Sequence, residues 1–183
     1  MRSFDPFPEL ETPRLLLRRV VSADADAFFQ LRSDPEVIQY RARPPLTRAE
    51  AERRLLDIDA GIRDHAQIMW AIALREDRRM IGECCLFRWE KEDMRAEVGY
   101  ELMVPYWGRG LVTEAVKAML AFGFQSMDLH RVEANVDPAN VGSIRVLERL
   151  GFVREATLRE NWRVAGRFVD SALFGLLRRE FIL

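Results

Sequence analysis

The fold is decided by the stretch from Ala96 to Ala121, which reads AEVGYELMVPYWGRGLVTEAVKAMLA. Its first part is rich in Val, Tyr, Leu and Met and predicts a β-strand. After Gly110 the apolar residues recur at helical spacing, so a helix is expected to begin directly after a glycine-bearing turn. A helix start presents unpaired N–H groups and the positive end of the helix dipole, and glycine lets a ligand approach the backbone. The stretch therefore predicts a phosphate cradle between a strand and a helix.

Two well-known phosphate cradles are excluded by the same residues. The chain has no GxxxxGK[ST] pattern, which excludes the nucleotide P-loop. GRGLVT, residues 108–113, lacks the third glycine of the dinucleotide pattern GxGxxG. These two absences disfavour a nucleotide-binding protein. Taken alone, a GxG turn is also typical of a helix that simply begins at a flexible turn.

A second stretch, HRVEANVDPANVGSIRVLERLGF from His130 to Phe152, helps to interpret the first. Together the two resemble the GNAT acetyltransferase superfamily: YWGRGLVTEA is similar to its pyrophosphate loop, and NVGSIRVLERLGF to its second conserved helix. Within the superfamily the chain resembles the Rim-type ribosomal-protein N-acetyltransferases, since ETPRLLLR is similar to their opening strand. The resemblance covers about Glu11 to Phe181, and it implies an acetyl-CoA-dependent N-acetyltransferase.

Composition sets the broad class of the protein. The 183 residues are 49% apolar and 31% charged, which predicts one globular domain over residues 1–183. The net charge of −1 argues against nucleic-acid or membrane partners, and no apolar run approaches a membrane span. The only cysteines, Cys84 and Cys85, are adjacent, so we expect no disulfide, no metal site and a cytoplasmic location. His65 and His130 stand apart and are expected to be structural or surface residues.

The order of expected elements is β-α-α-β-β-β-α-β-α-β-β. Ser22 is expected to cap the first helix, and the capping box Thr47–Glu50 to open the second, which ends at Gly61. Asn140 is expected to cap the last helix, and Gly151 to end it. The expected strands are Thr12–Val20, Ile68–Leu74, Met80–Phe87, 96–104, Arg131–Val136, Phe152–Arg159 and Phe168–Leu177, the last two around NWRVAG.

This order matches the GNAT fold. The resemblance implies an α/β (α+β) protein with a mixed central sheet of about seven strands and about four flanking helices. Strands 96–104 and 131–136 are expected to splay apart, with a bulge near Gly99–Tyr100. The acetyl group would lie in the resulting gap.

The resemblance also implies how acetyl-CoA is held. Backbone N–H groups of the loop would bind the pyrophosphate, the Met103–Val104 backbone would pair with the pantetheine arm, and Asn140 would bond a pantetheine amide. Superfamily members usually carry Gly or Ala where this chain has Val112, so Val112 is expected to weaken CoA binding or to displace the loop. The implied cofactor-binding residues are Met103, Val104, Trp107, Gly108, Arg109, Gly110, Val112, Thr113, Asn135, Asn140 and Ser143.

Acetyl transfer also needs a base for the ammonium and a proton for the departing thiolate. Glu97, in AEVGY, matches the position of the general base in some superfamily members. Glu101 lies four residues along the same strand and so on the same face, and Glu83 on the neighbouring strand is a third candidate. Ser143 matches the serine that protonates the thiolate in Rim-type enzymes. Each of these residues could equally have a structural role or face solvent.

The acceptor amine is not fixed by the sequence. The segments expected to wall its pocket, 40–45 and 159–167, are rich in arginine and hold Trp162; the arginines are Arg41, Arg43, Arg159, Arg163 and Arg167. Such walls favour a peptide α-amine or a carboxylate-bearing amine over a polyamine, unless the arginines face solvent. The acceptor is expected to be a ribosomal or other protein N-terminus, whose amine attacks acetyl-CoA directly in a ternary complex, and the enzyme is expected to be a monomer or homodimer. The alternatives are acetylation of a small amine (amino acid, polyamine or antibiotic) and a non-catalytic CoA-binding module.

Overall fold

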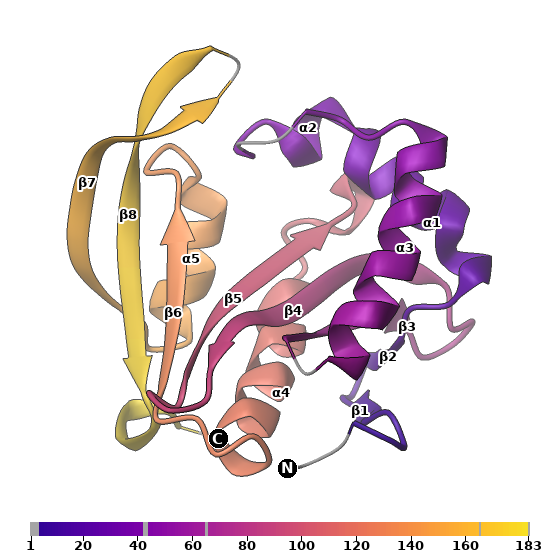
Figure 1. Ribbon diagram of the computed structural model, residues 1–183, viewed down its shortest axis with the longest axis horizontal. Helices are drawn as coiled ribbons and strands as arrows, with labels where there is room; N and C mark the ends of the chain where they lie inside the picture. The colour runs from indigo at the N-terminus through magenta and orange to yellow at the C-terminus, as the bar shows by residue number, and fades with distance from the viewer. Residues whose placement is uncertain (1–3, 42–43, 65, 165, 183) are drawn as a thin grey trace.

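The centre of the computed structural model is a mixed sheet, and the residues described are 4–41, 44–64, 66–164 and 166–182. Within them eight strands follow the spatial order β1-β2-β3-β4-β5-β6-β8-β7 (Figure 1). The strands are β1 Leu10–Glu11, β2 Leu15–Arg19, β3 Gln67–Leu74, β4 Met80–Glu90, β5 Arg95–Leu102, β6 Arg131–Val136, β7 Val153–Val164 and β8 Arg167–Leu177. The helices are α1 Ala25–Ser33, α2 Pro35–Ile38, α3 Arg48–Arg63, α4 Leu111–Gln125 and α5 Val141–Arg149, with short 3-10 turns η1 Ser22–Asp24, η2 Val104–Tyr106 and η3 Arg178–Glu180.

The sheet consists of two antiparallel halves joined by a short parallel contact. β5 pairs with β6 only over Arg95–Glu97 against Arg131–Glu133. Beyond this point β5 stays with β4, whereas β6 stays with β8 as far as Val136 opposite Ala172. Figure 1 shows β5 and β6 diverging toward the end of the sheet where α2 lies. The predicted splay is therefore confirmed.

The predicted bulge at Gly99–Tyr100 is wrong. The register between β4 and β5 is continuous from Gly82 opposite Leu102 to Phe87 opposite Glu97. The irregularity lies instead between Phe87 and Glu90, where Arg88 has a positive φ of 49°. The gap opens because the two strands keep different partners, so no extra residue is needed in β5. Without a bulge, Glu97, Gly99 and Glu101 share one face of β5, as alternation predicts for the two glutamates.

Helices cover both faces of the sheet. α4 packs against β2, β4 and β5, and its face buries Ala96, Val98 and Leu102 of β5. α1 packs on β4 and α3 on β3, on the face that carries Glu83, Glu97 and Glu101. The core is apolar on the α4 face, while polar residues of β4 and β5 face α1. In the described part of the chain, no helix is both long and apolar enough to cross a membrane.

Several local expectations are confirmed. The capping box opens α3, where the Thr47 N–H donates to Glu50 at 2.8 Å and the Thr47 hydroxyl accepts from the Glu50 N–H at 3.3 Å. At α5 the Asn140 side chain accepts from the Ser143 N–H at 3.0 Å. Gly151 follows α5 with φ +89°, the left-handed conformation that favours glycine. Strand β6 has the predicted bounds.

Other element boundaries differ from the expectation. Ser22 does not cap a helix; it begins the 3-10 turn η1, where the Asp24 carboxylate accepts from the Val21 N–H. The second helix passes through Gly61 to Arg63, and its last N–H contacts are made by Asp64. The closing strands are longer than predicted, because Trp162 and Val164 still pair with β8.

The counts and two strand ends also need correction. Two short elements, β1 and α2, raise the totals in the described residues from seven strands and four helices to eight and five. The strand that was predicted to begin at Thr12 is β2, and it begins at Leu15. β5 ends at Leu102, because Pro105 cannot donate to the ladder and Val104 starts the 3-10 turn η2. The Met103 N–H still bonds the Ile81 carbonyl at 2.9 Å.

Candidate active site

A cavity of about 1000 Å³ opens where β5 and β6 separate. Its floor comes from β4, β5 and β6, and its walls from α1, α2, the start of α4 and α5. Trp162 of β7 closes one side. The strands divide its polar groups into two sets, because side chains alternate between the faces of a strand. One set lies toward α4 and α5, and the other toward α1 and α3.

The start of α4 forms the first part of the α4 side. Gly108 and Gly110 have φ values of +73° and +74°, so both need glycine, and a Cβ at Gly108 would meet nothing within 4 Å. The loop is fixed from outside by Arg14, which donates to the Arg109 carbonyl at 2.9 Å and pairs with Glu114. The first-turn N–H groups of α4 have no earlier helical turn to bond, so they are available to an anion.

Most of the predicted cofactor residues line the cavity: those of α4 and α5 lie on this side, and Asn135 lies on the β6 face that also carries Glu133, the register partner of Glu97. Met103, Val104 and Arg109 do not line it: Met103 packs against the core, Val104 lies in η2, and Arg109 stacks over the Tyr106 ring at 5.7 Å. Val112 lines the cavity and also packs against the core, as its apolar side chain favours. The lining members are Trp107, Gly108, Gly110, Val112, Thr113, Asn135, Asn140 and Ser143.

Asn135 tests whether these residues fit acetyl-CoA. Its side-chain oxygen is buried and has no hydrogen-bond partner among the described residues, although it lines the cavity. A buried acceptor without a partner is costly, so this oxygen calls for an N–H donor from a ligand. An amide-bearing arm such as pantetheine supplies such a donor, and the α4 start supplies N–H groups for a pyrophosphate. The residues present therefore fit the cosubstrate.

Tyr100 is a site residue that the sequence interpretation missed. Its hydroxyl lies 2.8 Å from the Ser143 Oγ, across the gap between β5 and α5. Burial raises the pKa of Tyr100, and the bond to Ser143 opposes this. The phenol is therefore protonated at neutral pH and can donate to Ser143. The sequence did offer a signal for Tyr100, because a Tyr in a half-buried strand needs a hydrogen-bond partner for its hydroxyl.

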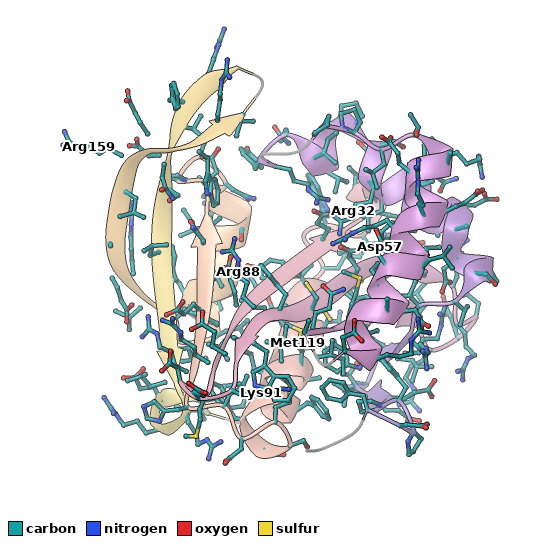
Figure 2. All side chains as sticks on the ribbon, viewed as in Figure 1. Arg32, Asp57, Arg88, Lys91, Met119 and Arg159 are labelled. Atoms are coloured by element: carbon teal, nitrogen blue, oxygen red, sulfur yellow. The ribbon has the colours of Figure 1, made fainter. Side chains whose placement is uncertain are left out.

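Glu97 lies at the apex of the splay, in the last pair that joins β5 to β6. Its side chain is 15% exposed, lines the cavity and accepts from Arg88 at 2.6 Å. Burial raises the pKa of Glu97 above its ordinary value, and the Arg88 charge lowers it in part. Figure 2 shows Arg88 lying near the strands β5 and β6. Sequence reasoning missed Arg88 because the irregular end of β4 turns it toward β5.

The opposite side of the cavity holds a cluster of charges, which we call the acceptor-side cluster: Arg32, Arg41, Glu83 and Glu101. Arg32 of α1 pairs with Glu83 of β4 and, at 3.2 Å, with Glu101 of β5. Arg41 pairs with the same oxygen of Glu101 at 2.9 Å. Figure 2 shows Arg32 reaching from α1 toward these strands.

Burial controls the protonation of this cluster. The Glu83 side chain is 4% exposed and that of Arg32 is 9% exposed. Burial raises the pKa of both Glu83 and Glu101, although Arg32 opposes the shift in each. Cys85, which lies next to this pair on the same face and opposite Gly99, has its pKa raised to about 12 by burial. It is therefore a thiol and not a nucleophilic thiolate at neutral pH.

The predicted arginine walls of the acceptor pocket are not formed. Arg41 and Trp162 line the cavity, but Arg159, Arg163 and Arg167 are exposed and do not line it. Because side chains alternate along β7, the strand that turns Trp162 inward turns Arg163 outward. Arg43 and His65 lie outside the described residues; His130 is exposed, as expected. Cys84 and Cys85 are both free, and among the described side chains no group suited to a metal ion occurs.

Comparison with known proteins gives one consistent result. Residues 14–153 match the family described as acetyltransferase (GNAT) domain. The chain is 37% identical over 174 residues to the uncharacterized N-acetyltransferase p20 of Bacillus licheniformis, covering 94% of this chain and 97% of that one. It superposes on a spermidine N-acetyltransferase from Vibrio cholerae with a TM-score of 0.83 and 21% identity, covering 92% and 98%. A ribosomal-protein-S5-alanine acetyltransferase from Vibrio fischeri gives a TM-score of 0.82 and 21% identity, covering 96% and 100%. At these identities, the two structures show the fold alone.

Proposed function

Because the chain belongs to the GNAT acetyltransferase family and is an acetyl-CoA-dependent N-acetyltransferase, we propose that Glu97 is its general base. The observation that carries this proposal is the position of the Glu97 carboxylate, inside the cavity at the point where β5 and β6 separate. A primary amine that enters from the α1 side reaches this point before it reaches the α4 side. It attacks directly in a ternary complex with acetyl-CoA, which supplies the activated acyl group.

Proton transfer explains why a buried glutamate suits this position. An unperturbed amine has a pKa of about 10.4 for Lys and nearly 8 for an α-amino group, so at neutral pH it must lose a proton before it attacks. The raised pKa of Glu97 makes it a stronger base than an exposed carboxylate. Arg88 keeps the carboxylate ionised before the amine arrives. Glu101 and Glu83, the other candidates, are bound to Arg32 and lie farther along the strands.

The departing thiolate also needs a proton, and the candidate donors lie on the other face of β5. We infer that Ser143 donates this proton and receives one from Tyr100, since their hydroxyls are 2.8 Å apart, and that solvent returns the proton to the Tyr100 phenol. Asn140 fixes the first turn of α5 by accepting from the Ser143 N–H. The base and the acid therefore lie on opposite faces of one strand. Because of this separation, Glu97 can take a proton from the amine while Ser143 gives one to the thiolate, and no proton passes directly between the two residues.

The cosubstrate is assigned to the α4 side of the cavity. The N–H groups of Gly108, Gly110, Val112 and Thr113 would hold the pyrophosphate, with the helix dipole favouring its charge. From the opposite face, where β6 separates from β5, the Asn135 side chain would accept an amide N–H of the pantetheine arm. Trp107 is held in place by its indole N–H, which donates to the Leu102 carbonyl at 2.6 Å. Its ring is 43% exposed and lies at the mouth of the cavity.

We infer that the acceptor is the α-amine of a protein or peptide, such as a ribosomal protein. Structural neighbours that include a ribosomal-protein acetyltransferase support this choice, as do the open cavity and the aromatic surface of Trp162. The support from the arginine walls is lost, because three of the five arginines do not line the cavity. A small-molecule amine is the second candidate, and the spermidine N-acetyltransferase neighbour favours it. We also infer a single domain over residues 1–183 and a cytoplasmic location, the latter from the free cysteines.

Thermal melting and turnover together test the proposed function. Acetyl-CoA should raise the melting temperature of the protein, and ATP should not. Thiol release from acetyl-CoA is then measured with peptides that begin with Ser or Ala, with amino acids, with polyamines and with aminoglycosides. Release with at least one primary amine supports the proposal. Binding of acetyl-CoA without release for any amine would point to the non-catalytic module.

A further inference from the structure

The acceptor-side cluster contains buried polar atoms that its own ion pairs leave unsatisfied. One carboxylate oxygen of Glu83 and one of Glu101 are buried and have no hydrogen-bond partner among the described residues. The Arg32 Nε is a third such atom. Both glutamates and Arg32 line the cavity, so a ligand that displaces a neighbouring side chain can reach these buried atoms. The cluster therefore offers two unused acceptors and one unused donor, and it calls for a ligand richer in N–H groups than in oxygens.

The two arginines of the cluster differ in how firmly they are held. Arg32 lies on α1, is 9% exposed and contacts both glutamates. Arg41 follows α2, is 27% exposed and contacts only Glu101. Both reach the same oxygen of Glu101, and its other oxygen is the unpartnered one. Arg41 can therefore move out of the cluster without breaking an ion pair of Glu83, whereas Arg32 cannot.

Charge balance selects what can replace Arg41. Among the described residues, this side of the cavity carries Arg32, Arg41 and Arg54 against Glu36, Glu83, Glu97 and Glu101, and Arg88 beside it pairs with Glu97. These charges cancel, and a buried site strongly penalises an excess of either sign. A cation that displaces Arg41 keeps the balance, whereas an anion would face two buried carboxylates. An ammonium also brings the N–H donors that the two free carboxylate oxygens lack.

The position of the cluster relative to Glu97 fixes the shape of the ligand. Glu97 and Glu101 lie on one face of β5 with Gly99 between them, so β5 adds no side chain there, and the Cys85 and Phe87 side chains of β4 lie against the glycine. Four residues of extended strand span roughly 13 Å. A molecule lying along this face can place its reacting amine at Glu97 and a second group at Glu101.

We propose that the acceptor-side cluster is a subsite for a second positive charge on the acceptor, and that Arg41 occupies it as a resident cation until the acceptor displaces it. The second charge lies on the order of 10 Å from the reacting amine. A small diamine and a peptide whose second residue is Lys both meet this description. The inference rests on the proposed function only in taking the α1 side of the cavity as the acceptor side.

The test is a binding measurement on the CoA-saturated protein, which carries no acetyl group to transfer. Calorimetry compares octane-1,8-diamine with octylamine, and a Ser-Lys amide with a Ser-Leu amide. The diamine and the Ser-Lys amide should each bind about tenfold or more tightly than their partners, equivalent to about 1.4 kcal/mol. A larger ratio of affinities within the diamine pair indicates a small acceptor, and a larger ratio within the peptide amide pair indicates a peptide acceptor.

Three variants assign the preference to this cluster. Glu101→Gln should remove the preference for the second charge, and Arg41→Ala should increase it because the resident cation is gone. Glu92→Gln, an exposed glutamate outside the cavity, serves as the matched control and should keep the wild-type ratio. Each variant is first melted with acetyl-CoA to show that it is folded. Equal binding within both pairs, or a preference that survives Glu101→Gln, would overturn the inference while leaving the turnover test of the proposed function intact.

Discussion

The two sides of the cavity are built in opposite ways. On the α4 side, the polar groups come from short stretches of sequence, 108–113 and 140–143, and many of them belong to the backbone. On the α1 side, they are side chains joined across long separations: Arg32 and Glu83 are 51 residues apart, and Arg32 and Glu101 are 69 apart. The first side depends on the conformation of the chain, and the second on the balance of buried charge.

This difference predicts how each side responds to substitution. Backbone N–H groups cannot be removed by changing a side chain, so the α4 side should be broken mainly by added bulk or charge at its glycines. The α1 side should respond to the loss of single charges, because a buried charge without its partner is costly. Substitutions on each side, ordered from the largest expected effect to the smallest, test the comparison.

Gly110→Glu should have the largest effect. It adds a negative charge at the start of α4, and its φ of +74° disfavours any side chain by roughly 1–2 kcal/mol. We expect the affinity for acetyl-CoA to fall by about a hundredfold or more, and the ligand-induced rise in melting temperature to vanish. Calorimetry with CoA gives the affinity directly.

Gly166→Glu is the matched control for this variant. Gly166 also has a positive φ, +84°, and a Cβ there would meet nothing within 4 Å, but it lies at the β7–β8 turn outside the cavity. The same strain and the same charge should therefore leave CoA binding unchanged. If both variants bind CoA as the wild type does, the pyrophosphate is not held at the start of α4.

Glu97→Gln should lower kcat by about 10²–10³-fold, because the amide keeps the shape of the side chain and removes its basicity. The affinity for CoA should not change, since Glu97 faces the acceptor side. Glu133→Gln is the control: Glu133 is the register partner of Glu97 on β6, yet it does not line the cavity. Equal turnover of both variants across pH 6 to 9 would exclude Glu97 as the base.

Tyr100→Phe should have a smaller effect, about tenfold on kcat, because Ser143 remains to donate the first proton. Ser143→Ala should cost at least as much, and the double variant little more than Ser143→Ala alone, since the two hydroxyls act in series. Steady-state rates of the three variants form the test. Fully multiplicative losses would show that the hydroxyls act independently.

The contrast between the two sides also explains what the sequence could predict. The Gly108–Thr113 loop and the Asn140 cap were predicted because each depends on residues close together in the chain, whereas the splay of β5 from β6 was implied by the family resemblance. Eight of the eleven predicted cofactor residues line the cavity. Met103, Val104 and Arg109 do not line it, because η2 ends the strand early and Arg109 turns onto Tyr106; their predicted roles belong to backbone groups and stay predictions.

The acceptor side could not be predicted in the same way. Arg32 looks like an ordinary helix-surface residue in the sequence, and only the packing of α1 on β4 buries it against Glu83. Local arginine density indicated the wrong residues, since strand alternation turns Arg163 outward. The bulge at Gly99–Tyr100 was expected as the cause of the splay, whereas β5 and β6 separate because β5 stays paired with β4 and β6 with β8, which needs long-range pairing information.

Arg88→Ala should have the smallest effect and appear only in the pH profile. Glu97 has a pKa raised by burial, so its basic form is lost as the pH falls through that raised value, and the Arg88 charge holds the value down. Removing the charge should raise the pKa further, and the acid limb of kcat/KM should move to higher pH. Arg88 is 70% exposed, so solvent screening keeps the change in the pKa of Glu97 small. Arg88→Lys retains the charge and should leave the limb near its wild-type position, and 0.5 M salt should shrink the difference. A limb that moves to lower pH in Arg88→Ala would mean that the titrating group is not Glu97.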